Sequence, residues 1–259
     1  MKQMQSDVNK RRAVRQRKAR RRRLKIAFVF FLIIALITLA IMCFTVFFPI
    51  KRINVSGSEI YSKTEIIKAS KLTTDDNLWV ISEKEIENNI RKKLPYIDNV
   101  KLKRVFPDAV VLTVTDANEY AYYQLGDKYY ILSDNGYILK EQSEMPENVF
   151  EIVTSGIEGS ISKKIVYKNS SEEELVNTLI SALKRKEINI DRIDVSNVLQ
   201  LKLEVEDRFT VVLGTSDYIE EKITHLSGMI ESISDRKGMI NLSMWTPTNS
   251  QGSFVEENV

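Results

Sequence analysis

The sequence predicts a membrane-anchored α+β protein: one transmembrane helix, a small domain of order β-α-α-β-β, and a mostly antiparallel β domain with flanking helices. The first observation is a run of 23 residues, 26–48, without a charged side chain. The second is a charge division, because residues 1–25 hold twelve Lys/Arg against one acid, whereas the chain after the run holds twenty-six against thirty-four. The third is that apolar residues beyond the run alternate as in strands, with stretches of helical spacing between them.

The uncharged run is long enough to cross a bilayer. A helix rises about 1.5 Å per residue, so residues 26–48 reach the roughly 30 Å of a hydrocarbon core. The run holds no Gly or Pro, and Pro49 follows it directly. A secretory signal peptide would have an apolar region of about 7–15 residues and then a small-residue cleavage site. Because Phe47-Phe48-Pro49 lacks that pattern, we expect an uncleaved anchor.

The charge division predicts the orientation of the anchor. Basic flanks remain on the cytoplasmic side of a membrane. We therefore expect a cytoplasmic N-terminus, with residues 1–25 as a basic tail, and a single-pass type II protein whose remainder lies outside the cytoplasm. Basic clusters such as Arg20–Arg23 also attract nucleic acid. Since they abut the membrane, topology and anionic lipid already explain them, and no nucleic-acid partner is expected.

The segment 50–115 forms the first predicted domain. Two possible capping boxes, Ser62-x-x-Glu65 and Ser82-x-x-Glu85, precede stretches with helical spacing of apolar residues. The second stretch ends at Pro95. Strands are expected at 53–55, 100–106 and 110–114.

The segment 116–245 forms the second predicted domain, which is richer in strands. The clearest strand is 199–205, where Leu199, Leu201, Leu203 and Val205 share one face. Ser171-x-x-Glu174 predicts the start of one helix, and a second is expected from about residue 218. A last strand is expected over 239–244, followed by a flexible polar tail, 246–259.

No pattern typical of catalysis or metal binding stands out, so we expect no enzyme activity, no cofactor and no small-molecule substrate. Nucleophile-elbow, zincin, Walker and dinucleotide-binding motifs are absent from the sequence. The sole cysteine, Cys43, lies in the predicted span, and His225 is the sole histidine. The acidic runs at 172–174 and 220–221 are interpreted as solvated helix faces.

Several local motifs, in this order, resemble the FtsQ/DivIB family of bacterial cell-division proteins. They are INVSGS at 53–58, RVFP at 104–107, ILSDNGYIL at 131–139 and GMINLS at 238–243. The resemblance covers residues 10–245. It implies a cytoplasmic tail, one membrane helix at 26–48, a POTRA domain at 50–115 and a family-type β domain at 116–245.

The resemblance also implies a function. The chain would be a non-enzymatic scaffold of the divisome at the division septum, binding small bitopic proteins of the FtsB/DivIC and FtsL types and other divisome components. Through them it would help to control septal peptidoglycan synthesis. The partner would add a strand at the C-terminal edge of the β domain, which predicts partner contacts at Ile240, Asn241, Leu242, Ser243, Met244 and Trp245.

Two other interpretations remain open. A POTRA-type adaptor in polypeptide transport or folding would usually carry several POTRA copies or a barrel, and one copy is predicted here. An exported enzyme with an unrecognised site is the third. Both fit the sequence less well than a scaffold does.

Overall fold

The computed structural model describes residues 25, 27–39, 42, 48–233, 236–249 and 251–257. Residues 27–39 are helical. Residues 1–24 of the predicted tail lie outside the described residues, and so do residues 26, 40, 41 and 43–47 of the predicted span. Within the described stretches, no helix has the length and apolar character needed to cross a bilayer.

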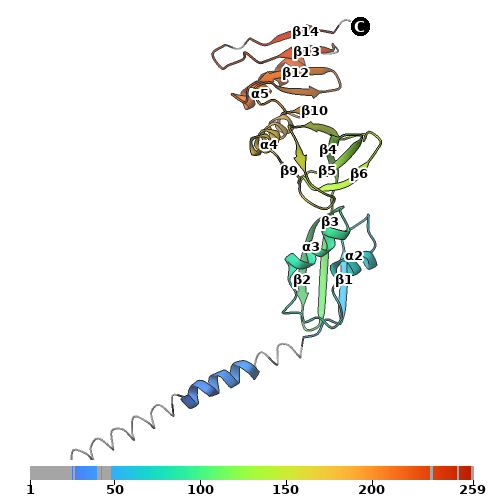
Figure 1. The fold of residues 1–259 in the computed structure, drawn as a ribbon, viewed down its shortest axis with the longest axis vertical. Helices are drawn as coiled ribbons and strands as arrows, with labels where there is room; N and C mark the ends of the chain where they lie inside the picture. Colours follow the sequence, from blue (N-terminus) through green and yellow to red (C-terminus); the bar gives the residue numbers. More distant parts are fainter. Residues whose placement is uncertain are drawn as a thin grey trace, which may run out of the picture. The chain divides into compact units, whose positions relative to one another are not determined.

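The predicted POTRA region has the expected order of elements (Figure 1). Its three strands form one sheet in the order β1-β3-β2. The elements are β1 (Arg52–Ser56), α2 (Lys63–Ser70), α3 (Glu83–Lys93), β2 (Ile97–Val105) and β3 (Ala109–Asp116).

Local sequence explains both helices of this region. Ser62 and Glu65 form the predicted capping box on α2, because the Ser62 side chain accepts from the Glu65 N–H and the Glu65 carboxylate accepts from the Ser62 N–H. On α3, the buried side chains of Ile86 and Ile90 lie one turn apart. Acidic residues occupy its first turn and basic residues its last, as the helix dipole favours.

The chain forms two compact units, each made of more than one segment or of segments distant in the sequence. One contains Leu72–Ser82 and Leu102–Leu112 with the chain up to Asn54. The other contains Val55–Lys71, Glu83–Lys101 and Thr113–Val259.

The β domain is built on a nine-stranded sheet. The order is β14-β13-β12-β11-β10-β7-β4-β5-β6, and a separate two-stranded sheet pairs β8 with β9. The β7–β10, β4–β7 and β12–β13 pairs are parallel and the other pairs are antiparallel, so the sheet is mostly antiparallel. The elements are β4 (Glu119–Leu125), β5 (Lys128–Ser133), β6 (Ile138–Gln142), β7 (Phe150–Val153), β8 (Ile157–Glu158), β9 (Val166–Tyr167), α4 (Ser170–Arg185), β10 (Ile190–Asp194), β11 (Leu201–Val205), β12 (Phe209–Gly214), α5 (Ile219–Ile233), β13 (Gly238–Asn241) and β14 (Ser253–Glu256).

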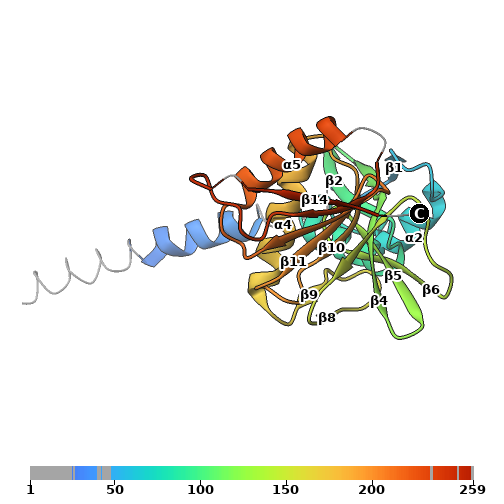
Figure 2. The same ribbon diagram turned by 90° about the horizontal axis from the view of Figure 1, so that it is seen from above.

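The core lies between the sheet and the two long helices. Figure 2 shows α4 and α5 together beside the fan of strands. Leu179 of α4 and Leu226 of α5 are fully buried in the same cluster as Leu203 of β11 and Val211 of β12. Alternation along each strand explains this layering, since Lys202, Glu204 and Thr210 point to the opposite, solvated face.

The structure differs from the sequence prediction at several places in this domain. Leu199 was expected to share the buried face of the strand, but β11 begins at Leu201 and Leu199 is exposed. The N-cap of α4 is Asn169 instead of Ser171, because the Asn169 side chain accepts from the Ser171 N–H. Glu172 is buried rather than solvated, and its carboxylate accepts from the Ser155 N–H at 3.1 Å.

Candidate partner-binding end of the sheet

The six residues predicted to contact a partner lie at and just beyond β13. Ile240 and Leu242 are fully buried in the core, whereas Met244 is exposed. The strand ends at Asn241, three residues earlier than expected. The reason is local, since the Asn241 carboxamide oxygen accepts from both the N–H and the hydroxyl of Ser243 and turns the chain.

β13 is not the edge of the sheet, contrary to the expectation for the last strand. The chain continues past Trp245 and returns as β14, which pairs antiparallel with β13 from Gly238↔Glu256 to Asn241↔Ser253. A strand at Ser253–Glu256 also differs from the flexible tail expected over 246–259. The sequence holds a weak signal for it, because Phe254 and Val255, two residues of types that favour strands, follow Gly252 and Ser253 in an otherwise polar tail.

The direction of the β14 amides follows from the bonds around it. Leu242 N donates to Val212 O of β12, and Gly238 N donates to Arg208 O, so even-numbered amides of β13 point to β12. Odd-numbered amides of β13 therefore point to β14. Glu257 N donates to Lys237 O, so odd-numbered residues of β14 bond inward. The N–H groups of Phe254 and Glu256 consequently point away from the sheet.

The side chains of β14 bury little surface against the rest of the domain. Phe254 is half-buried and packs edge-on against Phe209, with ring centroids 6.2 Å apart. Arg236 lies over the Phe254 ring and has its guanidinium 3.9 Å from the Glu256 carboxylate. Val255 is 64% exposed, and Met239, its cross-strand neighbour, is 46% exposed. The two leave an apolar pair on the solvent face beside the open backbone.

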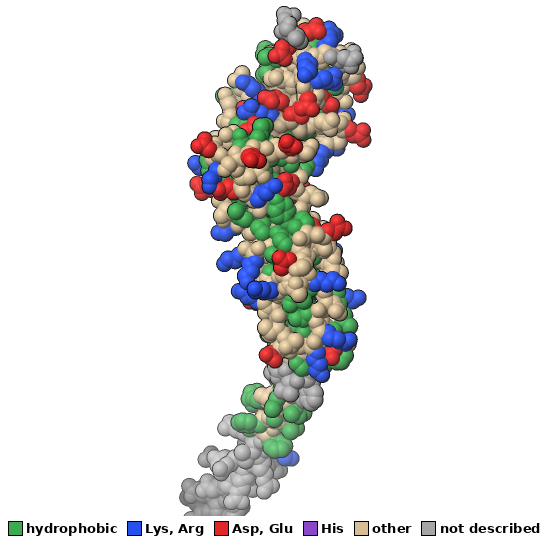
Figure 3. Space-filling view, turned by 90° about the vertical axis from the view of Figure 1, so that its right-hand side faces the viewer, with side chains coloured by type: hydrophobic (Ala, Val, Ile, Leu, Met, Phe, Trp, Pro, Cys, Tyr) green, Lys and Arg blue, Asp and Glu red, His purple; other side chains and the backbone are tan. Residues whose placement is uncertain are grey.

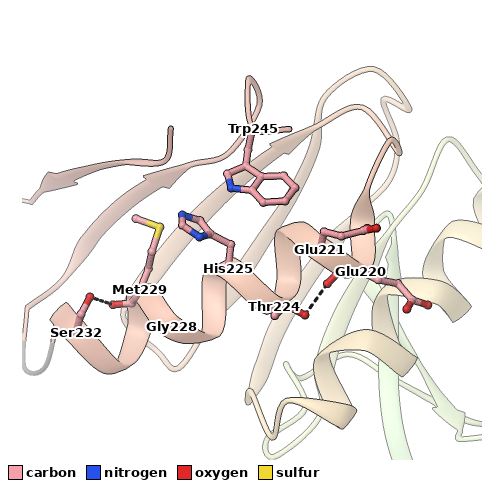
Figure 4. A pocket seen from close by; sticks show the side chains of 8 residues that line it. All are labelled: Glu220, Glu221, Thr224, His225, Gly228, Met229, Ser232 and Trp245. Carbon is pink, nitrogen blue, oxygen red and sulfur yellow. Dashed lines mark hydrogen bonds between the residues drawn. The ribbon is translucent and has the colours of Figure 1, made fainter. Parts of the chain in front are cut away.

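A groove of about 760 Å³ lies next to this end of the sheet, on the outer side of α5. In Figure 4, Trp245 and His225 lie next to each other in its wall, and their ring centroids are 5.7 Å apart. Among the described residues, the buried Nε1 of Trp245 has no hydrogen-bond partner. The groove is lined by Glu220, Glu221, Thr224, His225, Gly228, Met229, Ser232 and Trp245.

The opposite end of the sheet has a different character. At β6, Lys140 pairs with Glu119 at 2.7 Å, and Glu141 pairs with Lys128. Paired charges on an edge strand discourage another strand from adding. β14 itself carries a single charged side chain, Glu256, and has the apolar pair of Met239 and Val255 beside its outward amides, so it is the better place for strand addition.

In the described ranges, no group of three or more His, Cys, Asp or Glu side chains could hold a metal ion. One buried charged residue, Lys222, instead forms hydrogen bonds within the fold. The Lys222 ammonium of α5 is buried and donates to Leu213 O at 2.7 Å and to Thr215 O at 3.1 Å. Burial lowers the pKa of Lys222, and the attraction of Asp217 opposes part of that shift.

Comparison with known proteins gives the class of this chain. A family model described as "POTRA domain, FtsQ-type" matches residues 48–116. This match covers β1 to β3 and agrees with the β-α-α-β-β order of the structure. The chain is thus a POTRA protein with a mostly β domain and flanking helices after it.

Relatives that match most of the chain define the class more closely. Cell division protein DivIB of Clostridium acetobutylicum is 30% identical over 203 residues, which cover 76% of this chain and 80% of the relative. DivIB of Clostridium botulinum strain Hall is 27% identical over 89% of this chain and 91% of the relative. Cell division protein FtsQ of Streptomyces coelicolor is 22% identical over 79% and 78%. The chain belongs to the FtsQ/DivIB family of cell division proteins.

Proposed function

We propose that this protein is a membrane-anchored, non-enzymatic scaffold of the divisome at the septum. It binds small bitopic division proteins of the FtsB/DivIC and FtsL types and, through them, helps to control septal peptidoglycan synthesis. The N-terminus is cytoplasmic, and the POTRA region and the β domain lie outside the cytoplasm. The charge division around residues 26–48 supports this topology.

The partner strand adds at the β14 end of the nine-stranded sheet. One observation carries this proposal: the amides of Phe254 and Glu256 point outward beside the exposed pair of Met239 and Val255. An added strand satisfies such amides and covers the apolar pair. In this arrangement Ile240 and Leu242 support the edge from the core. Trp245 lines the α5 groove next to this end, and Met244, the preceding residue, is exposed.

A proline substitution tests the outer edge. Glu256→Pro removes one outward N–H and leaves the inward ladder bonds of β14 intact, a position where edge strands tolerate proline. The matched control is Glu256→Ala, which removes the same side chain and keeps the N–H. The measurement is titration of the full-length protein in nanodiscs with the extracytoplasmic part of a DivIC-type partner. We expect Glu256→Pro to weaken binding about 2- to 13-fold, since a hydrogen bond contributes about 0.5–1.5 kcal/mol, and Glu256→Ala to leave it unchanged.

A second proline distinguishes addition from replacement. Val255→Pro removes an inward N–H and detaches β14 from Met239. Binding that weakens in both proline variants supports addition onto β14. Binding that strengthens in Val255→Pro and is unchanged in Glu256→Pro would mean that the partner takes the place of β14 on β13. If both variants bind like the parent, this end of the sheet is not the partner site.

A further inference from the structure

Three aromatic rings form an exposed cluster at one end of the POTRA region. The ring of Phe48 lies 6.2 Å from that of Trp79 and 5.8 Å from that of Phe106, and the last two are 5.1 Å apart. Despite these contacts, Trp79 is 51% exposed and Phe106 49% exposed. Val80 and Val105 are exposed beside them. Exposed apolar patches of this kind mark surfaces that meet another molecule or a membrane.

Backbone bonds tie the cluster to the chain that leaves the apolar segment. Leu78 N donates to Phe48 O at 2.9 Å, and Ile50 N donates to Asp76 O at 2.9 Å. Pro49 and Asn77 form a bridge between these two bonds. These backbone bonds hold the loop that carries Trp79 against Phe48, and the two rings lie 6.2 Å apart.

The position of Phe48 in the sequence also indicates the depth of the cluster relative to the membrane. This residue is the last of the uncharged run 26–48, so an anchor built from this run places Phe48 at the outer end of the hydrocarbon core. Rings within about 6 Å of Phe48 then lie at the level of the lipid headgroups, because a headgroup region adds several ångströms to each side of the core.

The charges around the cluster fit the same surroundings. Four basic side chains are exposed near the cluster: Lys51, Arg52, Lys103 and Arg104. One acidic residue, Asp108, pairs with Arg52 at 2.8 Å. Asp75 and Asp76 in the adjoining loop partly offset this positive charge. On the face of the POTRA region that Figure 3 shows, hydrophobic and basic side chains are interspersed. Basic side chains with apolar stems reach from a membrane interface toward lipid phosphates.

We propose that the cluster of Phe48, Trp79 and Phe106, with Val80 and Val105, inserts into the outer lipid–water interface of the membrane. Aromatic side chains favour this interface, where the ring is in apolar surroundings and polar atoms reach water. The cluster thereby attaches this end of the POTRA region to the bilayer, in addition to the attachment that the membrane helix provides. The inference rests on the anchoring in the proposed function.

Tryptophan fluorescence tests the inference in the full-length protein. The chain has two tryptophans, so Trp245→Phe leaves Trp79 as the single reporter. The protein is reconstituted in liposomes whose acyl chains carry bromine, a quencher, either near the headgroup or near the chain end. We expect loss of Trp79 emission in brominated lipid, greater for bromine near the headgroup. Equal emission in brominated and unbrominated liposomes would overturn the proposal.

Controls separate insertion from anchoring and from a protein partner. Flotation of the same liposomes after an alkaline carbonate wash reports the anchor: a chain that floats without quenching overturns the insertion alone, and one that does not float overturns the anchor as well. Val80→Glu should reduce the quenching, whereas Val166→Glu, at an exposed apolar position on β9, should not. A Trp79 emission that shifts to shorter wavelength only when a DivIC-type partner is added, without quenching by bromine, would assign the cluster to that partner and overturn the proposal.

Discussion

Arg104 offers a sharp test of how the POTRA region holds its Trp79 loop. Its guanidinium, on β2, donates from Nε to Leu78 O at 2.8 Å and from Nη2 to Ile81 O at 2.7 Å. One side chain thus spans both ends of the loop. Arg104→Ala removes both bonds and leaves the backbone bond between Leu78 and Phe48 and the buried Leu78 side chain to hold the loop.

The exposure of the two carbonyls sets the size of the effect. Hydrogen bonds from a charged donor contribute about 1.5–3 kcal/mol when they are shielded from water, and ordinary exposed ones about 0.5 kcal/mol. The bond to Leu78 is partly buried and the bond to Ile81 is exposed. We therefore expect a loss of about 2 kcal/mol in the free energy that keeps the loop closed, which corresponds to roughly 30-fold faster opening.

Amide hydrogen exchange measures this opening directly. The Leu78 amide, bonded to Phe48 O, should exchange roughly 30-fold faster in Arg104→Ala than in the parent. Arg104→Lys, which keeps the charge but loses the fork of donors, should fall between the two. The matched control is Lys103→Ala, an exposed basic residue on the same strand, for which no change is expected. Exchange within about threefold of the parent in Arg104→Ala would refute the clamp.

Two further predictions concern the β domain. The folded protein loses the Lys222 proton at lower pH than the unfolded chain, because burial lowers the pKa of this residue, so folding becomes more favourable as pH rises toward the unfolded value of about 10.4. Denaturant unfolding of the parent and of Lys222→Met should show the parent gaining stability relative to the variant between pH 7 and about pH 10; a constant difference would contradict this. Gly238→Ala should speed hydrogen exchange at the Val255 amide, because the added methyl group would overlap the Val255 carbonyl oxygen. Gly228→Ala in α5, where the methyl group meets no atom within 4 Å, should leave Val255 protected and stabilise the helix by up to about 1 kcal/mol; equal exchange in both variants would argue against the contact.

Local signals predicted the POTRA region well, since its order of elements depends on short-range chemistry. Ser62 and Glu65 are three residues apart and cap α2 without help from the rest of the chain. The stripe of Ile86 and Ile90 likewise places α3 on the sheet by helical periodicity alone.

The β domain was harder to predict because its strands are stabilised by pairing with strands that are distant in the sequence. β10 has the sequence IDRID, which reads as polar in isolation. In the sheet, Arg192 lies between Glu151 of β7 and Glu204 of β11 and pairs with both, at 3.1 and 3.5 Å. The same holds for β14, whose pairing with β13 no local pattern specifies, and this is why the candidate site lies one strand further out than expected.

The place of β7 has a consequence for how this domain forms. β7 lies between β4 and β10 and runs parallel to both. It therefore joins the part of the sheet made of β4, β5 and β6 to the part made of β10 to β14. During synthesis, β4 to β7 are made before α4 and β10, and until these follow, one side of β7 has no partner strand and Phe150 and Ile152 lack their cover. Unpaired strand edges in partly made chains are prone to aggregate. We expect the nascent chain to need protection, by a chaperone or by export in an unfolded state, until Ile193 has been added and the two halves of the sheet can join.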